Sequence, residues 1–241
     1  MTPADDDLGG WDDSAQAWID DLASEHEFGR RHVLDPAMLA RVRRRSFANA
    51  LDVGCGEGRF CRLLAAEGMA PIGIDPAEAL LAEARRRDPQ GDYRLGRAER
   101  LAFDDASFDL VVSYLTLIDI PDIGAAIPEM ARVLRPGGTL LIAHINAFTT
   151  ATIVGTDEWP EEEERIRGYL TERSGWVEWR GIRIRNWHRP MATYMTLLLD
   201  AGLTLRHFAE PPATGGPADR RAQYDDAPWF HVMEWAKADS E

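Results

Sequence analysis

The chain has few of the features that mark a metal-binding or membrane protein. Only two of its 241 residues are cysteines, Cys55 and Cys61, and neither has a neighbouring Cys or His at metal-ligand spacing. No apolar run approaches the roughly 20 residues of a membrane-spanning helix, and the N-terminus is acidic where a signal peptide would be basic. We therefore expect a cytoplasmic protein with no metal and no membrane partner.

Basic residues are also scarce relative to acids. Lys and Arg number 27 against 41 Asp and Glu, which gives a net charge of −14. Most of such a surface repels a polyanion, so we expect no nucleic-acid partner. The basic stretch RVRRRS, residues 41–46, is interpreted as a solvated helix end where cations suit the dipole, with a local binding site as the alternative. The oligomeric state stays unknown at this stage.

The stretch ALDVGCGEGRF, residues 50–60, has the strongest local pattern in the chain. Its apolar start is interrupted by glycines at positions 54, 56 and 58, after which Phe60, Leu63 and Leu64 recur at helical spacing. This predicts a strand, a tight glycine turn and the start of a helix. Glycines let the backbone approach a bound group, and the free N–H groups of the helix start face the same space.

Spacing separates two classes of nucleotide-type fold that use such a turn. A dinucleotide fingerprint needs a third glycine or alanine three residues after the second, and Arg59 stands at that position here. The following apolar strand, residues 72–74, ends in Asp75, where an acid can accept hydrogen bonds from ribose hydroxyls. An NAD-dependent oxidoreductase is therefore only a remote alternative.

A GxGxG turn followed by an acid at the end of the second strand resembles the class I S-adenosylmethionine-dependent methyltransferases. The stretches FGRRHVLDPAML from Phe28, RVLRPGG before the fifth strand, and HRPMATYMTLLLDAGL from His188 resemble the small-molecule branch with a ubiquinone/menaquinone-biosynthesis-like core. The likeness covers about residues 28–145 and the helix after His188. It implies S-adenosyl-L-methionine as the cofactor.

The resemblance also implies where the cofactor binds. Asp75 takes the ribose beside Pro76, the turn Gly54, Cys55 and Gly56 lies next to the methionine part, and Asp52 orients that turn or holds the amino group. Cys55 on its own pattern is simply a small residue that fills the turn.

Two cofactor contacts implied by the resemblance keep alternatives. Arg30, ahead of VLDP, matches the arginine that binds the cofactor's carboxylate, and the alternative is an ion pair with Glu25 or Glu27. The family's Gly-Asp-Ala turn at the adenine is Gly-Arg-Ala here, residues 96–98. The missing acid leaves a backbone contact around Ala98, with Glu99 as a substitute.

The resemblance places the floor of the methyl-transfer site at the end of the fourth strand, which makes Ser113, Tyr114 and Leu115 candidates for contact with the cofactor. Asp119 is either a catalytic base or the cap of the following turn. The preferred base candidates are His144 and His188, because imidazole titrates near neutral pH. For each, a hydrogen-bonded structural imidazole is the alternative, and a carboxylate acceptor needs no base.

The predicted architecture is α/β: a Rossmann-like, seven-stranded, mostly parallel sheet with helices on both faces and an antiparallel last strand. Residues 46–145 and 189–241 are expected to form this core. Residues 1–45 are expected to form an N-terminal helical lid. One helix face there carries Trp11, Ala15, Trp18, Ile19 and Leu22, and Trp18 is a candidate cofactor contact if these side chains are more than core anchors.

Residues 146–188 are expected to form a substrate-cap insertion. Its aromatic residues suit an apolar or aromatic substrate, or join the cap to the core. We expect a hairpin around Gly181 and a loop from Pro211. Pro128 favours a helix that begins near Ile127, since an interior proline costs about 3 kcal/mol.

These observations predict an S-adenosylmethionine-dependent methyltransferase that transfers a methyl group to an O or N atom of a small molecule, in specialised metabolism or elsewhere. The alternatives are a peptide or protein (carboxylate) methyltransferase and, more remotely, a non-catalytic S-adenosylmethionine-binding protein. The sequence does not identify the acceptor or the pathway.

Overall fold

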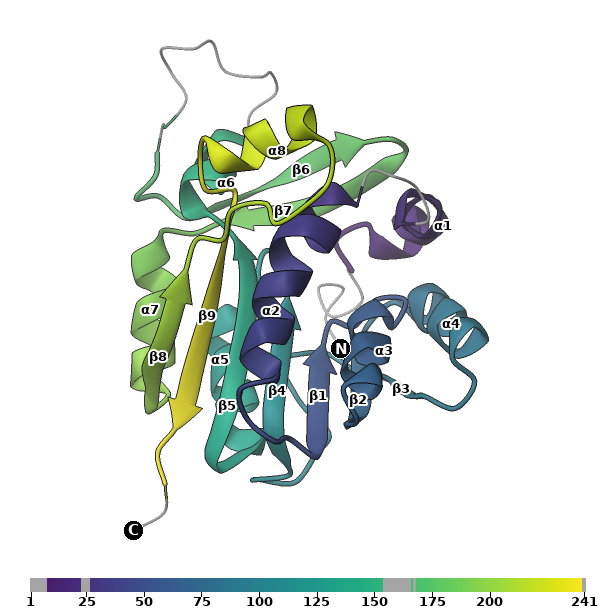
Figure 1. Ribbon diagram of the computed structural model, residues 1–241, viewed down its shortest axis with the longest axis vertical. Coiled ribbons are helices and arrows are strands. Elements are labelled where there is room, and N and C mark those ends of the chain that lie inside the picture. Colours follow the sequence, from purple (N-terminus) through teal and green to yellow (C-terminus); the bar gives the residue numbers. More distant parts are fainter. Residues whose placement is uncertain (1–7, 23–26, 154–165, 167, 240–241) are drawn as a thin grey trace, which may run out of the picture.

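A computed structural model describes residues 8–22, 27–153, 166 and 168–239 (Figure 1). Its centre is a seven-stranded sheet of β1 Asn49–Val53, β2 Ala70–Asp75, β3 Asp92–Leu95, β4 Phe108–Tyr114, β5 Leu134–Ile145, β8 Leu203–Ala209 and β9 Phe230–Lys237. The strand order is β3-β2-β1-β4-β5-β9-β8, and β9 runs antiparallel to both of its neighbours while the other pairs are parallel. The predicted seven-stranded sheet with an antiparallel last strand is confirmed.

Helices cover both faces of the sheet (Figure 1). One face carries α2 Asp35–Val42, α3 Arg59–Ala66 and α4 Glu78–Arg87, and the other carries α5 Ile123–Val133 and α7 Met191–Asp200. Along β4, Leu110 and Val112 pack toward α2 and α3, while Val111 packs toward α5 and α7. A strand that is buried on both sides needs a continuous apolar run, as this one has.

The stretch around the glycines forms the predicted strand, turn and helix. β1 ends at Val53, and α3 begins after Gly58, whose φ of +75° is unfavourable for a residue with a Cβ. A Cβ at Gly58 would also lie 2.5 Å from the nearest atom of the Tyr93 ring. The turn is thus fixed by backbone conformation and by space, not by composition alone.

The structure corrects the predicted start of the helix before RPGG. α5 begins at Ile123, not near Ile127, and Pro128 lies inside it. Asp122 caps the earlier start by accepting a hydrogen bond from the N–H of Ala125 at 3.0 Å. Burial of an apolar stripe offsets the cost of the proline; that stripe is Ile123, Ala126, Ile127, Met130 and Val133.

A second correction concerns the stretch from Pro211, predicted as a loop. It is irregular only as far as Pro217 and then forms α8 Ala218–Asp225. None of the α8 residues is buried, so the segment has no apolar stripe by which its periodicity could be recognised.

Several elements lie at the upper end of the sheet in Figure 1. They are α1 Trp11–Leu22, α6 Ala147–Ile153, α8 and the hairpin of β6 Arg173–Trp179 and β7 Ile182–His188. The predicted hairpin at Gly181 is confirmed: Arg180 and Gly181 both have positive φ, +44° and +81°, as a two-residue hairpin turn requires. Trp159, an aromatic residue of the expected substrate-cap insertion, lies outside the described residues.

α1 is joined directly to the hairpin. The N–H of Arg185 donates to the carbonyl of Gly9 at 2.8 Å, and Arg180 binds Asp21 through two hydrogen bonds of 2.6 and 2.9 Å. The ring of Trp18 packs edge-on against Trp179. The helix and the hairpin therefore form one connected layer beside the end of the sheet.

The basic stretch after α2 makes contacts within the protein. Arg43 forms two hydrogen bonds with Glu67, and Arg45 donates to Thr139 and to the carbonyl of Gly137. These contacts fit its interpretation as a helix end. Among the described residues, none of the helices combines the length and the apolar character that crossing a membrane requires.

Candidate functional site

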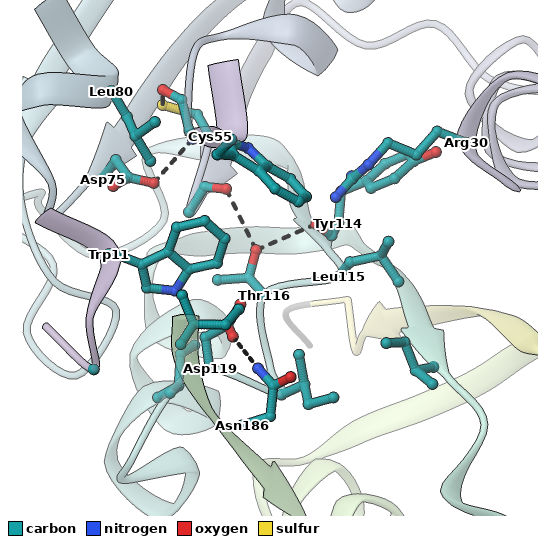
Figure 2. Close-up of a pocket in the computed structure, with 18 of the residues that line it drawn as sticks. Trp11, Arg30, Cys55, Asp75, Leu80, Tyr114, Leu115, Thr116, Asp119 and Asn186 are labelled. Atoms are coloured by element: carbon teal, nitrogen blue, oxygen red, sulfur yellow. Dashed lines mark hydrogen bonds between the residues drawn. The ribbon is translucent and has the colours of Figure 1, made fainter. Parts of the chain in front are cut away.

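A cavity of about 700 Å³ lies between the carboxyl ends of the parallel strands and the layer of α1 and the hairpin (Figure 2). Parallel α/β sheets bind ligands at this edge. Most of the predicted site residues contribute to its wall: Trp18, Arg30, Asp52, Gly54, Cys55, Gly56, Asp75, Pro76, Ala98, Glu99 and Tyr114. The fold thus brings together side chains that lie up to 96 positions apart in the sequence.

The glycine turn forms one wall of this cavity. The N–H groups of Gly54 and Cys55 donate to the carbonyl of Ile74 at 2.8 and 2.9 Å, which ties the turn to the end of β2. A Cβ at Gly54 would lie 2.6 Å from Thr116 Oγ1, whereas one at Gly56 would meet nothing within 4 Å. Gly54 is therefore packed against protein, and Gly56 faces open space.

Asp75 holds the turn from the other side. Its carboxylate accepts hydrogen bonds from the N–H of Gly56 and the N–H of Ala77, both at 2.9 Å. Burial raises the pKa of Asp75 to about 6, although these two hydrogen bonds oppose the shift. A carboxylate has about four acceptor positions, so capacity remains for ligand hydroxyls.

Asp52 lies deeper, with 1 % of its surface exposed. The thiol of Cys61 donates to Asp52 Oδ2 at 3.5 Å, and Oδ1 has no hydrogen-bond partner. Burial raises its pKa to about 7, and the nearby Asp75 adds to the shift. A buried, unpartnered carboxylate oxygen on a cavity wall is suited to a cationic or N–H donor from a ligand.

Arg30 forms the ion pair that was weighed as the alternative, and it also lines the cavity. Its Nε lies 3.1 Å from Glu27 Oε2, and its guanidinium packs over the rings of Trp18 and Tyr114 at 5.0 and 5.4 Å while it lines the cavity. Glu25, the other predicted partner, lies outside the described residues. The ion pair and the ring contacts orient the cation at the cavity wall.

A network that the sequence did not reveal supports this wall. Asp35 binds Arg59 through both carboxylate oxygens, and its Oδ1 accepts a hydrogen bond from the Tyr114 hydroxyl at 2.9 Å. Arg59 occupies the position where a dinucleotide fingerprint needs a small residue. Asp35 lies within the quoted VLDP stretch, but its partners are 24 and 79 positions away, so no local signal indicates them.

The turn after β3 reaches the cavity as predicted. Gly96, Arg97, Ala98 and Glu99 all line it, and Arg97 Nε lies 3.7 Å from Glu99 Oε2. The N–H of Gly96 donates to the carbonyl of Asp75 at 3.1 Å, which keeps this turn next to the end of β2.

Ser113 does not reach the cavity, contrary to the prediction. It is fully buried in β4, on the α5 and α7 side of the sheet, because neighbouring strand residues point to opposite faces. Tyr114 and Leu115 do line the cavity, together with Thr116, which the sequence interpretation missed. Because side chains alternate between the two faces along β4, the sequence pattern could have separated Ser113 from Tyr114.

His144 and His188 are also placed away from the cavity wall. His144 is 1 % exposed and packs against Tyr194 and His231, and burial lowers its pKa well below the usual value. His188 bonds Thr150 Oγ1 at 2.8 Å and the carbonyl of Tyr169 at 2.9 Å. This placement agrees with the structural alternative for both imidazoles and gives neither of them access to a ligand in the cavity.

Asp119 lines the cavity at the loop after β4 (Figure 2). Asn186 of β7 donates to Asp119 Oδ1 at 2.6 Å, and the Trp11 side chain lies beside this pair. Burial raises the pKa of Asp119 well above its ordinary range, with Asp75 adding to the shift and Arg30 opposing it. Capping of α5 falls instead to Asp122.

The rest of the cavity wall is mainly apolar and aromatic, and it also includes Arg180 and Arg185 of the hairpin. Its other members include Ile145, Thr149, Ile153, Trp179, Ile184, Trp187, Tyr224, Trp229 and Phe230. Trp176, another aromatic residue of the insertion, does not line the cavity and packs instead against Arg183 and Arg185. Among the described residues no group of three or more His, Cys, Asp or Glu side chains could hold a metal ion.

Residues 51–142 match the model of a family described as a methyltransferase domain. The chain is 30 % identical over 172 residues to a ubiquinone biosynthesis O-methyltransferase of Xylella fastidiosa, a match that spans 64 % of this chain and 70 % of the relative. It is 37 % identical over 131 residues to a malonyl-[acyl-carrier protein] O-methyltransferase of Enterobacter lignolyticus, spanning 54 % of this chain. The chain covers about half the length of that relative, 49 %.

The fold is likewise similar to solved structures. An S-adenosylmethionine-dependent methyltransferase from Mesorhizobium loti superposes with a TM-score of 0.71 at 26 % identity, over 84 % of this chain and 96 % of that one.

Proposed function

The chain belongs to the class I S-adenosylmethionine-dependent methyltransferases, and we propose that it transfers a methyl group from that cofactor to an oxygen or nitrogen atom of a small molecule. The single observation that carries the proposal is a convergence in one cavity. The glycine turn, Asp75, the turn at Ala98 and the floor at Tyr114 end four different segments and line the same space.

The residues of this cavity fit the cofactor. The open space at Gly56 leaves room for a ligand against the backbone, and the unpartnered Oδ1 of Asp52 suits the amino group. Asp75 would bind the ribose and Arg30 the carboxylate. Because the acid of the family's adenine turn is replaced by Arg97, the backbone at Ala98 with Glu99 would contact the adenine.

The bound cofactor supplies a methyl group that is already activated by the positive charge of its sulfonium. The protein's own task is then to align the acceptor and to exclude water. The layer of α1 and the hairpin covers the cavity and would exclude water from it. Within this layer, Trp18 of α1 packs edge-on against Trp179 of the hairpin.

The size of the cavity favours a small acceptor. The aromatic and apolar wall beyond Asp119 belongs to a cavity of about 700 Å³ that also has to hold the cofactor, within the range of small-molecule sites. One relative is named as an O-methyltransferase of ubiquinone biosynthesis, and another as an O-methyltransferase of malonyl-[acyl-carrier protein]. An acceptor of the second kind is carried on a protein and would fall in the alternative class.

The test is transfer of labelled methyl from S-adenosylmethionine into size-fractionated extract of the source cells. Wild type, Asp75→Ala and Asp200→Ala are compared, since Asp200 is an exposed acid at the end of α7. We expect label in the small-molecule fraction with wild type and Asp200→Ala but not with Asp75→Ala. Label in the polypeptide fraction would establish the alternative class, and binding of the cofactor without transfer to either fraction would indicate a non-catalytic binding protein.

A further inference from the structure

We propose that Asp119 takes the proton from the acceptor during methyl transfer, and that the acceptor is an aromatic compound whose methylated group carries that proton, a phenol or an aromatic amine. The inference rests on the proposed function. It assigns a chemical role to Asp119, a cavity residue that has no role in the proposed binding of the cofactor.

The first support is the position of Asp119 in the cavity. It lies on the loop between β4 and α5, at the point where the cofactor-binding edge of the sheet meets the aromatic wall. Its hydrogen-bond partner is the side-chain amide of Asn186, a neutral donor at 2.6 Å, and the Trp11 side chain lies beside it (Figure 2). One neutral donor leaves acceptor positions of the carboxylate open to a substrate.

The second support is that the other acids on the wall are committed elsewhere. Asp21 is held by Arg180 through two hydrogen bonds, and Glu27 forms an ion pair with Arg30. Glu57 pairs with Arg62 and Arg87. Asp52, Asp75 and Glu99 are among the residues assigned to the cofactor, and Glu99 also lies 3.7 Å from Arg97.

The third support is that hydrogen bonds from the buried Arg189 fix the loop that carries Asp119. Arg189, which has no exposed surface, donates to the carbonyls of Leu117, Ile120 and Pro121 at 3.2, 2.9 and 2.8 Å, on both sides of Asp119. The N–H of Asp119 also donates to the carbonyl of Thr116 at 2.9 Å. Arg189 is thus a positioning residue, and such preorganisation suits a group that must meet a reacting atom.

The electrostatic surroundings suit a base. Burial and Asp75 raise the pKa of Asp119, and Arg30, Trp11 and the hydrogen bond from Asn186 oppose that rise. A positively charged ligand in the same cavity would oppose it too, and so would favour the carboxylate form that a general base needs.

The neighbouring wall indicates the kind of acceptor. Trp187 follows Asn186 on β7, and Ile118, Ile120 and Ile184 complete an apolar surround, with Trp229 and Phe230 farther along. Flat apolar rings pack well against such walls. A single buried carboxylate among them matches one O–H or N–H group on an otherwise apolar ring.

The step balances without another reactant. A lone pair on the acceptor oxygen or nitrogen forms the new bond to the methyl carbon, and the electron pair of the breaking C–S bond stays on sulfur. The proton of the O–H or N–H group passes to Asp119 and is released to water after the product leaves.

The experiment uses the full chain with phenol, 4-chlorophenol and 4-nitrophenol as acceptors, and aniline as the amine. Asp119→Asn keeps the shape and removes the base. Asp122→Asn is the matched control, because the same change is made three residues along the chain at an exposed helix cap, where asparagine caps equally well. We expect Asp119→Asn to lower kcat/KM for phenol by roughly 10²- to 10⁴-fold. The loss for 4-nitrophenol should be much smaller, since that phenol ionises readily without help.

A second readout needs no turnover. The carboxyl carbon signal of Asp119, identified by its loss in Asp119→Asn, is titrated by NMR in the free protein and with S-adenosylmethionine or S-adenosylhomocysteine. The two ligands differ in the charge on sulfur. The pKa of Asp119 should be lower with S-adenosylmethionine than with S-adenosylhomocysteine.

Each part can fail separately. Equal losses for all phenols, or equal titration with both ligands, would overturn the role of Asp119 and leave the proposed function standing. Transfer to a compound in extract but to none of the four probes would overturn the aromatic class. Absence of S-adenosylmethionine binding by calorimetry would instead overturn the proposed function, and with it this inference.

Discussion

Asp75 Oδ2 accepts a hydrogen bond from the backbone N–H of Gly56 at 2.9 Å, so the acid that ends β2 also holds the glycine turn that ends β1. The two halves of the proposed cofactor site are therefore coupled before any ligand binds. A change at either residue should disturb both the ribose contact and the shape of the turn.

The first prediction concerns Asp75 itself. Asp75→Ala removes the acceptor for ribose hydroxyls and for the N–H of Gly56, and hydrogen bonds to a charged group contribute about 1.5–3 kcal/mol each. The affinity for S-adenosylmethionine should fall at least tenfold by titration calorimetry. An affinity equal to that of wild type and of the Asp200→Ala control would contradict the ribose assignment.

The second prediction separates two glycines of one turn. Gly54→Ala places a methyl group against Thr116 in a backbone with φ of +75°, so it should lower the unfolding temperature markedly. Gly56→Ala has φ of +54° but no neighbour within 4 Å, so it should cost only about 1 kcal/mol of stability. Because Gly56 faces the cavity, the variant should nevertheless lose most of its cofactor affinity.

Thermal unfolding measures the stability of the two variants, and calorimetry measures their affinity for S-adenosylmethionine. If Gly56→Ala binds S-adenosylmethionine as tightly as wild type does, the cofactor does not approach the turn at that residue. The stability of Gly54→Ala reports only on the packing of Gly54 against Thr116 and does not test cofactor binding.

How far the sequence predicts this structure depends on whether a signal is local. The glycine turn, Asp75 and the hairpin at Gly181 follow from turn chemistry within a few residues, and all were predicted. The start of α5 was not, because the cost of Pro128 is local while the burial that offsets it comes from the sheet. α8 was missed because it buries nothing.

The candidate site divides in the same way. The proposed cofactor-binding residues lie at strand ends, which the periodicity of the sequence can locate. Asp35 with Tyr114, and Asn186 with Asp119, are pairs separated by 79 and 67 positions, which only the folded chain brings together. His144 and His188 were chosen for their chemistry and their places at element ends, but the direction of a side chain at a strand end depends on packing that the sequence does not state.

The third prediction uses two adjacent arginines. Arg30 lines the cavity, whereas Arg31 is exposed on the outer side of the same helical turn. Arg30→Gln should weaken binding of S-adenosylmethionine about tenfold, since a charge-assisted bond to the carboxylate contributes on the order of 1.5–3 kcal/mol. Arg31→Gln should leave the affinity unchanged. Equal affinities for the two variants would assign Arg30 to its ion pair with Glu27 alone.

The last prediction concerns pH and the stability of the free protein. Burial raises the pKa of Asp52 to about 7 from an ordinary value of 3.8. The unfolded chain therefore loses this proton at a lower pH than the folded chain does, and folding becomes less favourable as pH rises from about 4 to 7. Asp52→Asn keeps the shape without the charge, so its advantage in unfolding free energy over wild type should grow by about 2 kcal/mol between pH 5.5 and pH 8. Denaturant unfolding at both pH values measures this difference, with the exposed Asp200→Asn as control. A constant difference would mean that Asp52 is ionised in the folded protein throughout, and its unpartnered oxygen would then have to be solvated.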